Sequence, residues 1–177
     1  MKKIVFVCLC LLSTACSQKE VPLSQLFTEK SAFGVKSGMT LEEVSKVLSL
    51  EKVNTKGCQE CYKSKSSPLQ NSLFSCYGFM FRDDRLEKIV GFNDIHPTNS
   101  DSTVVYDGYK ELIQVIDNKI KNGSLECAKL PSTIDEQTTY VCKKNYSIDI
   151  IYIDDGHNEK KNFKFMGITY TFFNDLS

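Results

Sequence analysis

The chain has 177 residues, and its 22 Lys and Arg side chains balance its 22 Asp and Glu side chains. Removal of the first 15 residues would take away Lys2 and Lys3 and no acidic residue, leaving 20 basic and 22 acidic side chains and a net charge of −2. Nucleic-acid binding relies on basic side chains that neutralise phosphates, so this balance excludes a strongly basic nucleic-acid surface. The remaining 162 residues suit one domain or two small repeats.

The first fifteen residues have the layout of a secretory signal peptide. Lys2 and Lys3 form a positive start, residues 4–12 form an apolar run, and small residues precede Cys16. The apolar run is too short to cross a bilayer as a stable helix, which needs about 20 residues. We therefore predict that residues 1–15 are cleaved from the mature protein.

The small residues directly before Cys16 resemble the lipobox, the cleavage and lipidation signal of bacterial lipoproteins. The usual Leu lies three residues before the cysteine, whereas here Ser13 stands there and Leu12 lies one position further back. The resemblance implies acyl chains on Cys16 that hold the protein in a membrane. Because Ser17 rather than Asp follows, it also implies an outer-membrane lipoprotein of a Gram-negative bacterium, on the periplasmic side. The alternative is an ordinary signal peptide in which Cys16 is incidental.

Residues 16–30 are polar and predict a tether, so that the folded domain would span residues 31–177. A helix from Leu41 to about Leu50 is the clearest local signal in the chain. Thr40 and Glu43 have the spacing of a capping box, in which each side chain bonds the backbone N–H of the other residue. Apolar residues follow at helical spacing and form one face: Leu41, Val44, Val47 and Leu48.

Residues 52–72 are polar and rich in turn signals, so we expect no regular element there. Two strands follow, at 74–81 and 86–92, with Asp83-Asp84 as the turn of a hairpin. Residues 93–103 then predict a linker.

A second helix is predicted from about Gly108 to Lys121, with Asp107 as its cap and Asn122-Gly123 as its stop. Three strands follow, at 138–142, 146–154 and 163–173. Strands that follow a helix in each half favour an α+β domain, in which helices pack on one face of an antiparallel sheet.

Five cysteines remain after Cys16, and a compartment outside the cytoplasm favours disulfides among them. Cys61 and Cys76 are separated by fourteen residues, and so are Cys127 and Cys142. We therefore predict the disulfides Cys61–Cys76 and Cys127–Cys142. Each half would then hold a helix, a cysteine and a strand with the partner cysteine, which suggests two tandem repeats over 33–95 and 104–177.

Cys58 is left over by this pairing. Cys58 and Cys61 have CxxC spacing, but a thioredoxin-like redox site needs a helix start within a βαβ unit, which the flanking residues do not supply. A Cys58–Cys76 bridge, a free Cys58 and a Cys58–Cys61 bridge remain open alternatives. A zinc site is not expected, since His96 and His157 stand alone in loop-like segments.

Residues 33–50 and 74–90 resemble the small outer-membrane lipoproteins of the SmpA/OmlA type, which include the BamE component of the barrel-assembly machinery. The likeness rests on Gly38-Met39-Thr40 before a short helix and on Tyr77-Gly-Phe-Met-Phe81 before an acidic turn. The Gly-x-Pro that usually follows the first helix is missing, and residues 49–51 stand in its place. A tandem form of this unit, with one disulfide per half, is similar to the secreted β-lactamase-inhibitor protein. The resemblance implies a fold class and a role in the cell envelope, and it transfers no binding residue.

A weaker resemblance is to the lysozyme-inhibitor lipoproteins. Residues 139–142, Thr-Tyr-Val-Cys, are similar to their Tyr-x-Cys opening, and residues 167–170 are similar to half of their Ser-Gly-x-x-Tyr loop. Met166 stands where that loop has Ser.

No Ser–His or Cys–His arrangement has the spacing of a catalytic site, and no cofactor motif is present. Asp83-Asp84 and Asp154-Asp155 are carboxylate pairs that suit calcium or acid–base chemistry, but Asp is also common in hairpin turns. We expect a non-catalytic lipoprotein that uses no cofactor and binds an envelope protein, in outer-membrane assembly or maintenance. The alternative is an inhibitor of a secreted enzyme such as a lysozyme or a β-lactamase.

Overall fold

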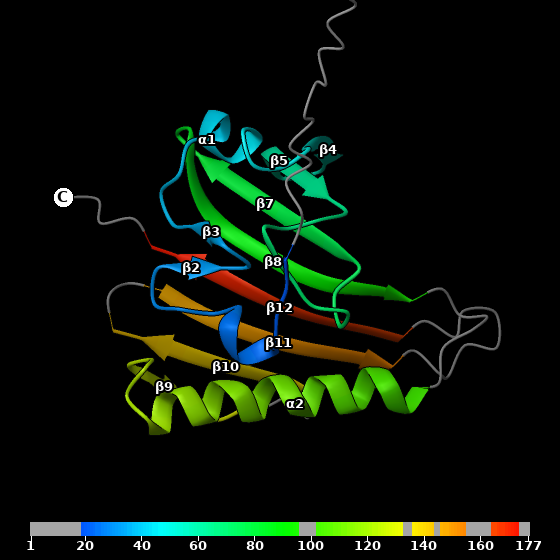
Figure 1. Ribbon diagram of the computed structural model, residues 1–177, viewed down its shortest axis with the longest axis vertical. Helices are drawn as coiled ribbons and strands as arrows, with labels where there is room; N and C mark the ends of the chain where they lie inside the picture. The colour runs from blue at the N-terminus through cyan, green and yellow to red at the C-terminus, as the bar shows by residue number, and fades with distance from the viewer. Residues whose placement is uncertain (1–18, 96–101, 133–135, 144–145, 155–163, 174–177) are drawn as a thin grey trace, which may run out of the picture.

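The computed structural model describes residues 19–95, 102–132, 136–143, 146–154 and 164–173 (Figure 1). Cys16 and both histidines therefore lie outside the described residues. The elements in chain order are β1 (Lys19–Glu20), the 3-10 turn η1 (Leu23–Gln25), β2 (Ser31–Ala32), β3 (Val35–Lys36), α1 (Leu41–Ser45), β4 (Glu51–Thr55), β5 (Cys58–Ser64), β6 (Leu69–Gln70), β7 (Cys76–Arg82), β8 (Arg85–Ile95), α2 (Ser102–Lys121), β9 (Cys127–Lys129), β10 (Gln137–Cys142), β11 (Tyr146–Asp154) and β12 (Lys164–Phe172).

One eight-stranded antiparallel sheet forms the body of the protein, in the order β4-β5-β7-β8-β12-β11-β10-β9. The N-terminal four strands and the C-terminal four strands each follow one another across the sheet as a meander. The last strand of each meander, β8 and β12, pair with one another at the centre over Lys88–Ile95 and Lys164–Thr171. Figure 1 shows the resulting broad, twisted sheet with the N-terminal segment in front of it.

The predicted α+β class is wrong, because strands account for 48% of the described residues and helices for only 20%. The error arises in residues 52–72, which were expected to be irregular and instead contain β4, β5 and β6. Alternation of polar and apolar residues is weak there because β4 is an edge strand. Of the residues in β4 whose burial is described, Val53 alone is half-buried and the others are exposed. An edge strand in contact with solvent has no need of the hydrophobic pattern that marks a central strand.

The core lies on one face of the sheet, which we call the core face. Central strands direct aromatic and aliphatic side chains to this face at every second position, as the period of a strand requires. The long helix α2 contacts β11 and β12 on this side and buries Val105, Leu112 and Ile116 there. The sheet residues of the core face that are at most 1% exposed are Tyr77, Phe79, Leu86, Ile89, Tyr140, Tyr146, Ile148, Ile150, Met166, Ile168 and Tyr170.

The N-terminal segment is packed from Lys19 onward, so the predicted tether over 16–30 is wrong from that residue. β1 pairs in parallel with β6, and the backbone N–H of Val21 donates to the carbonyl of Gln70 at 2.8 Å. Leu26 and Phe27 are buried at 1% and 0% exposure. The segment supplies apolar side chains that cover the sheet beside α2, which a solvated tether would not do.

Phe33 occupies the centre of this cover. It lies in the two-residue turn between β2 and β3 with a φ of 56°, a left-handed conformation that costs roughly 1–2 kcal/mol for a side chain of this size. Its ring is fully buried and makes edge contacts with Phe27, Phe74 and Tyr77 at centroid distances of 5.0–5.3 Å. The ring lies directly over Gly91 of β8, where a Cβ atom would overlap it.

Three local predictions are confirmed. The capping box is present, since the Thr40 N–H donates to the Glu43 carboxylate at 2.8 Å and the Glu43 N–H donates to the Thr40 hydroxyl at 3.2 Å. Asp83 and Asp84 form the hairpin turn between β7 and β8 with φ values of 51° and 58°. Gly123 follows the end of α2 with a φ of 77°. The helix boundaries differ, because α1 ends at Ser45 and α2 begins at Ser102 instead of near Gly108.

Gly91→Ala should lower the free energy of unfolding by about 1–3 kcal/mol, because the new methyl group would displace the buried Phe33 ring. Gly78→Ala is the matched control on the neighbouring strand β7, where a Cβ would meet Val90 at an ordinary 3.6 Å. Urea unfolding of both variants measures the difference. Equal stability of the two variants would contradict the packing described for Phe33.

Candidate binding surface

The described residues form two disulfides, Cys58–Cys61 and the predicted Cys127–Cys142. The predicted Cys61–Cys76 disulfide is absent and is replaced by the CxxC bridge. Register explains the error: Cys61 lies opposite Met80 on β7, four residues along the strand from Cys76. Four residues of a strand span about 13 Å, far beyond the Cα separation of about 7 Å that a disulfide tolerates.

The equal spacing of the two cysteine pairs therefore does not mark equivalent disulfides. Cys61 lies on β5, the second strand of the N-terminal meander, whereas Cys127 lies on β9, the first strand of the C-terminal meander. The cysteine spacing therefore does not indicate two repeats. The repeat boundaries at 33–95 and 104–177 remain a hypothesis.

The second face of the sheet, opposite the core face, is not covered by any described helix or strand, and we call it the open face. Its apolar side chains come from six strands and are all exposed or half-buried, with Val141 and Ile153 at 47% and 45% exposure. The register aligns them across the sheet, as in the row Phe92, Gly167 and Ile151. The apolar members of the open face are Val53, Met80, Val90, Phe92, Val141, Ile151, Ile153 and Phe165.

An aromatic pair lies near the middle of the open face. The rings of Phe92 and Phe165 are 5.9 Å apart, and the Phe165 ring lies beside Gly167, where a Cβ would come within 3.0 Å of it. A hollow of about 570 Å³ opens next to Phe92 and is lined by Cys76, Lys63 and Ser49 among others. Aromatic side chains beside a recess are typical of the sites that dominate binding energy in protein interfaces.

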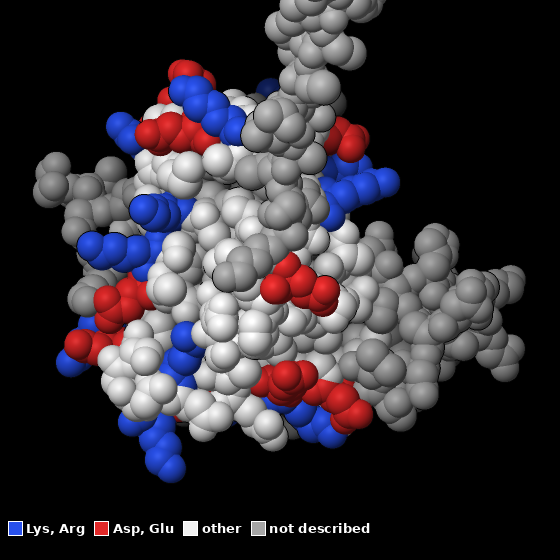
Figure 2. All heavy atoms as spheres, viewed as in Figure 1, with Lys and Arg blue, Asp and Glu red and all other residues white. Residues whose placement is uncertain are grey.

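Three of the charged groups on the open face have partners within it, and Lys88 of β8 is a further charged residue of this face. Lys63 and Glu51, on β5 and β4, form an ion pair at 3.3 Å. The Thr139 hydroxyl donates to the Asp149 carboxylate at 2.7 Å. On the opposite side of the molecule, which Figure 2 shows, Lys and Arg side chains are interspersed with Asp and Glu, and no single sign covers that face.

The described residues contain no group of three or more His, Cys, Asp or Glu side chains that could hold a metal ion. Asp83 and Asp84 serve the hairpin turn, and Asp84 accepts a hydrogen bond from the N–H of Leu41 at 3.2 Å, which joins the turn to α1. His96, His157 and Asp155 lie outside the described residues, as does the side chain of Asp154.

The shifted tyrosine pKa values reflect core packing. Burial raises the pKa of Tyr77 and of Tyr146 to about 12, and burial raises the pKa of Tyr170 well above its ordinary value. Burial, with a 2.7 Å hydrogen bond to Asp117, also raises the pKa of Tyr140. These four hydroxyls stay protonated at neutral pH, so none of them can act as a base there.

No family model, curated protein or solved structure matches this chain. The resemblances to SmpA/OmlA-type lipoproteins and to inhibitor proteins therefore remain hypotheses. Within the part of the chain that the structure describes, no helix is both long enough and apolar enough to cross a membrane. The structure itself defines the class: a mostly β domain with a broad antiparallel sheet that is covered on one face.

The sequence contained a signal for the open face that alternation alone does not use. Residues 150–153 of β11, Ile-Ile-Tyr-Ile, are apolar at consecutive positions. Such a run is typical of a strand with apolar contacts on both faces. Ile150 and Tyr152 fill the core, which leaves Ile151 and Ile153 on the open face.

Ile153→Ala should change the free energy of unfolding by less than about 1 kcal/mol, because the side chain is nearly half exposed. Ile150→Ala, three residues away on the core face of the same strand, should cost about 2–5 kcal/mol. Chemical unfolding of the two variants provides the test. A cost at Ile153 as large as that at Ile150 would show that the open face is covered.

Proposed function

We propose that this chain is a non-catalytic lipoprotein, anchored in the outer membrane through lipid on Cys16, that binds a folded envelope protein on its open face. The observation that carries the proposal is the open face itself, eight apolar side chains on a broad sheet that no described element covers. Apolar surface of this extent is uncommon on a monomeric protein and is typical of an interaction site.

The size of the open face supports a folded protein as the occupant. Seven spacings between eight strands give a width of about 34 Å, and four rows of alternate residues give a length of about 20 Å. The area is then about 700 Å², close to the roughly 800 Å² that each partner contributes to a standard interface. A small ligand would occupy only part of it.

The charge pattern supports a partner with a mostly uncharged contact area, with Lys88 as the exception. Lys63 and Asp149 already have partners within the open face, so they need none from a bound protein. Fully buried interface cores are depleted in charge and enriched in aromatic residues, as Phe92 and Phe165 are here. Outer-membrane assembly or maintenance is the process that the sequence resemblance suggests for such a partner.

Val141→Asp combined with Ile153→Asp should abolish co-purification of the partner after crosslinking in the native envelope, because buried unpaired carboxylates are costly in an interface. Val47→Asp is the matched control, since Val47 is 48% exposed but lies outside the sheet. Retained partner recovery in the double variant, with circular dichroism unchanged, would contradict the assignment of the open face. Loss of lysozyme or β-lactamase activity on mixing with the purified protein would instead identify a secreted enzyme as the partner.

Cys16→Ser should release the protein from the membrane fraction, because it removes the acyl chains that supply membrane affinity. Membrane fractionation and labelling with radioactive palmitate measure the effect, and Cys76→Ser serves as the control for loss of a cysteine. Continued palmitate incorporation into the Cys16→Ser variant would disprove lipidation at this residue.

A further inference from the structure

The Cys58–Cys61 disulfide bridges two residues of one strand. In a regular strand, residues three apart are separated by about 10 Å, but the Cα atoms of Cys58 and Cys61 are 5.8 Å apart. The strand accommodates the bridge with a register irregularity: Cys58 pairs with Thr55 and Cys61 with Val53, so one extra residue lies on β5. The disulfide therefore holds a β-bulge at the edge of the sheet.

The two disulfides of the domain have different surroundings. Cys142 is 7% exposed and belongs to the core, and Cys127 packs against the core from the directly opposite position on β9. Cys58 and Cys61 are half-buried residues that do not belong to the core cluster. An attacking thiolate can reach a disulfide only through an accessible sulfur. Both cysteines of the Cys58–Cys61 bond are half-buried, whereas in the other bond Cys127 alone is half-buried and it packs against the core.

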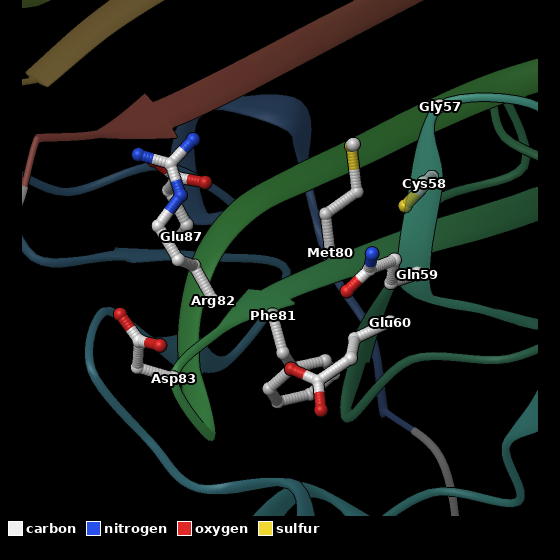
Figure 3. A pocket seen from close by; sticks show the side chains of 9 residues that line it. All are labelled: Gly57, Cys58, Gln59, Glu60, Met80, Phe81, Arg82, Asp83 and Glu87. Carbon is white, nitrogen blue, oxygen red and sulfur yellow. The ribbon is translucent and has the colours of Figure 1, made fainter.

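A hollow of about 370 Å³ adjoins Cys58 at the ends of β5, β7 and β8. Figure 3 shows the sulfur of Cys58 pointing from its strand toward this hollow, with Met80 and Glu60 on other sides of it. Arg82 and Glu87, which form an ion pair at 3.0 Å, close its far wall. The sulfur thus faces a recess that is open to an approaching group.

Loop size separates the two disulfides further. In the chain-entropy model, the stabilisation that a disulfide confers grows with the number of residues in the loop it closes. Cys58 and Cys61 are three residues apart in sequence, whereas Cys127 and Cys142 are fifteen apart. The Cys58–Cys61 bridge therefore constrains the unfolded chain less than the Cys127–Cys142 bridge does. Its reduction should lower the free energy of unfolding by less.

We propose that Cys58–Cys61 is a thiol-exchange site for a dithiol protein, and that its redox state controls the pairing of the edge strand β4. A thiolate of the dithiol protein attacks Sγ of Cys58, forms a mixed disulfide and displaces the Cys61 thiolate. The second thiol of the dithiol protein then attacks the first sulfur of the same protein, within the mixed disulfide, and releases Cys58 as a thiolate. Two electrons pass to this chain, which holds two thiols after protonation, and the dithiol protein becomes a disulfide.

Reduction removes the constraint that holds the bulge against β4. Once residues 58–61 can extend, the extra residue of β5 is no longer fixed, and a register change of one residue would turn the side chains of β4 to the other face. Glu51 and Val53 lie on the open face in the disulfide state. The exchange site would therefore alter one edge of the proposed binding surface. This consequence rests on the proposed function, whereas the exchange itself does not.

Reduction of the full-length protein by dithiothreitol or by thioredoxin, followed by alkylation and peptide mass spectrometry, tests the exchange. Cys58 and Cys61 should be alkylated at least about tenfold faster than Cys127 and Cys142, which are the internal control in the same molecule. Equal rates for the two disulfides would overturn the proposal.

Hydrogen–deuterium exchange of the selectively reduced protein tests the control of β4. Amides of residues 52–55 should lose protection at least about tenfold on reduction, whereas those of β10 and β11 should not change. The double variant Cys58→Ser with Cys61→Ser should reproduce the reduced pattern, which excludes an effect of the reductant. Unchanged protection of β4 in the reduced protein would overturn the proposal that the redox state controls the pairing of β4. This result does not depend on whether the protein is anchored in a membrane.

Discussion

The contact between the Phe33 ring and Gly91 joins the N-terminal segment to the centre of the sheet. Gly91 lies on β8, one of the two central strands, and its missing side chain leaves the space that the ring fills. The Phe33 backbone is held in its left-handed conformation by three hydrogen bonds: its N–H donates to Leu26 at 2.8 Å, and its carbonyl accepts from the Leu69 N–H and the Ser67 hydroxyl at 3.1 and 2.5 Å. The surrounding structure thus compensates the strain of the turn.

The two faces of the sheet differ because only one of them is covered by described elements. The N-terminal segment, fixed through Phe33 and β6, shares the core face with α2, and the two contact one another through η1. Together they bury the aromatic side chains of the central strands. No described element covers the open face, where Phe92, Phe165 and Ile153 are half-buried or exposed. Covering one face only leaves the apolar side chains of the other face exposed to solvent.

The packed N-terminal segment matters for the anchor as well. Lipidation at Cys16 would leave Ser17 and Gln18 between the lipid and the first paired residue, Lys19. Two intervening residues span about 10 Å at full extension. A lipidated form would therefore hold the domain close to the membrane surface, whereas the long tether expected from the sequence would have let it move away.

The sequence predicted those features that depend only on residues close together in the chain. The capping box at Thr40, the Asp83-Asp84 turn and the stop at Gly123 follow from backbone hydrogen bonds and φ angles, which a few residues determine. The partner of Cys61 could not be obtained this way, because it depends on the register of β5 against β7. Nor could the role of Phe33, because a bulky residue in a left-handed turn is disfavoured unless distant groups hold it. The open face required knowledge of what covers each side of the sheet.

We propose that the partner binds the open face. Site-specific photo-crosslinking in the native envelope tests it most directly, with the photoreactive residue at Thr169, in the middle of the open face, or at Glu111, on the exposed side of α2. If the partner binds the open face, position 169 should give one discrete crosslinked partner and position 111 none. A partner captured from position 111, with none from 169, would contradict it.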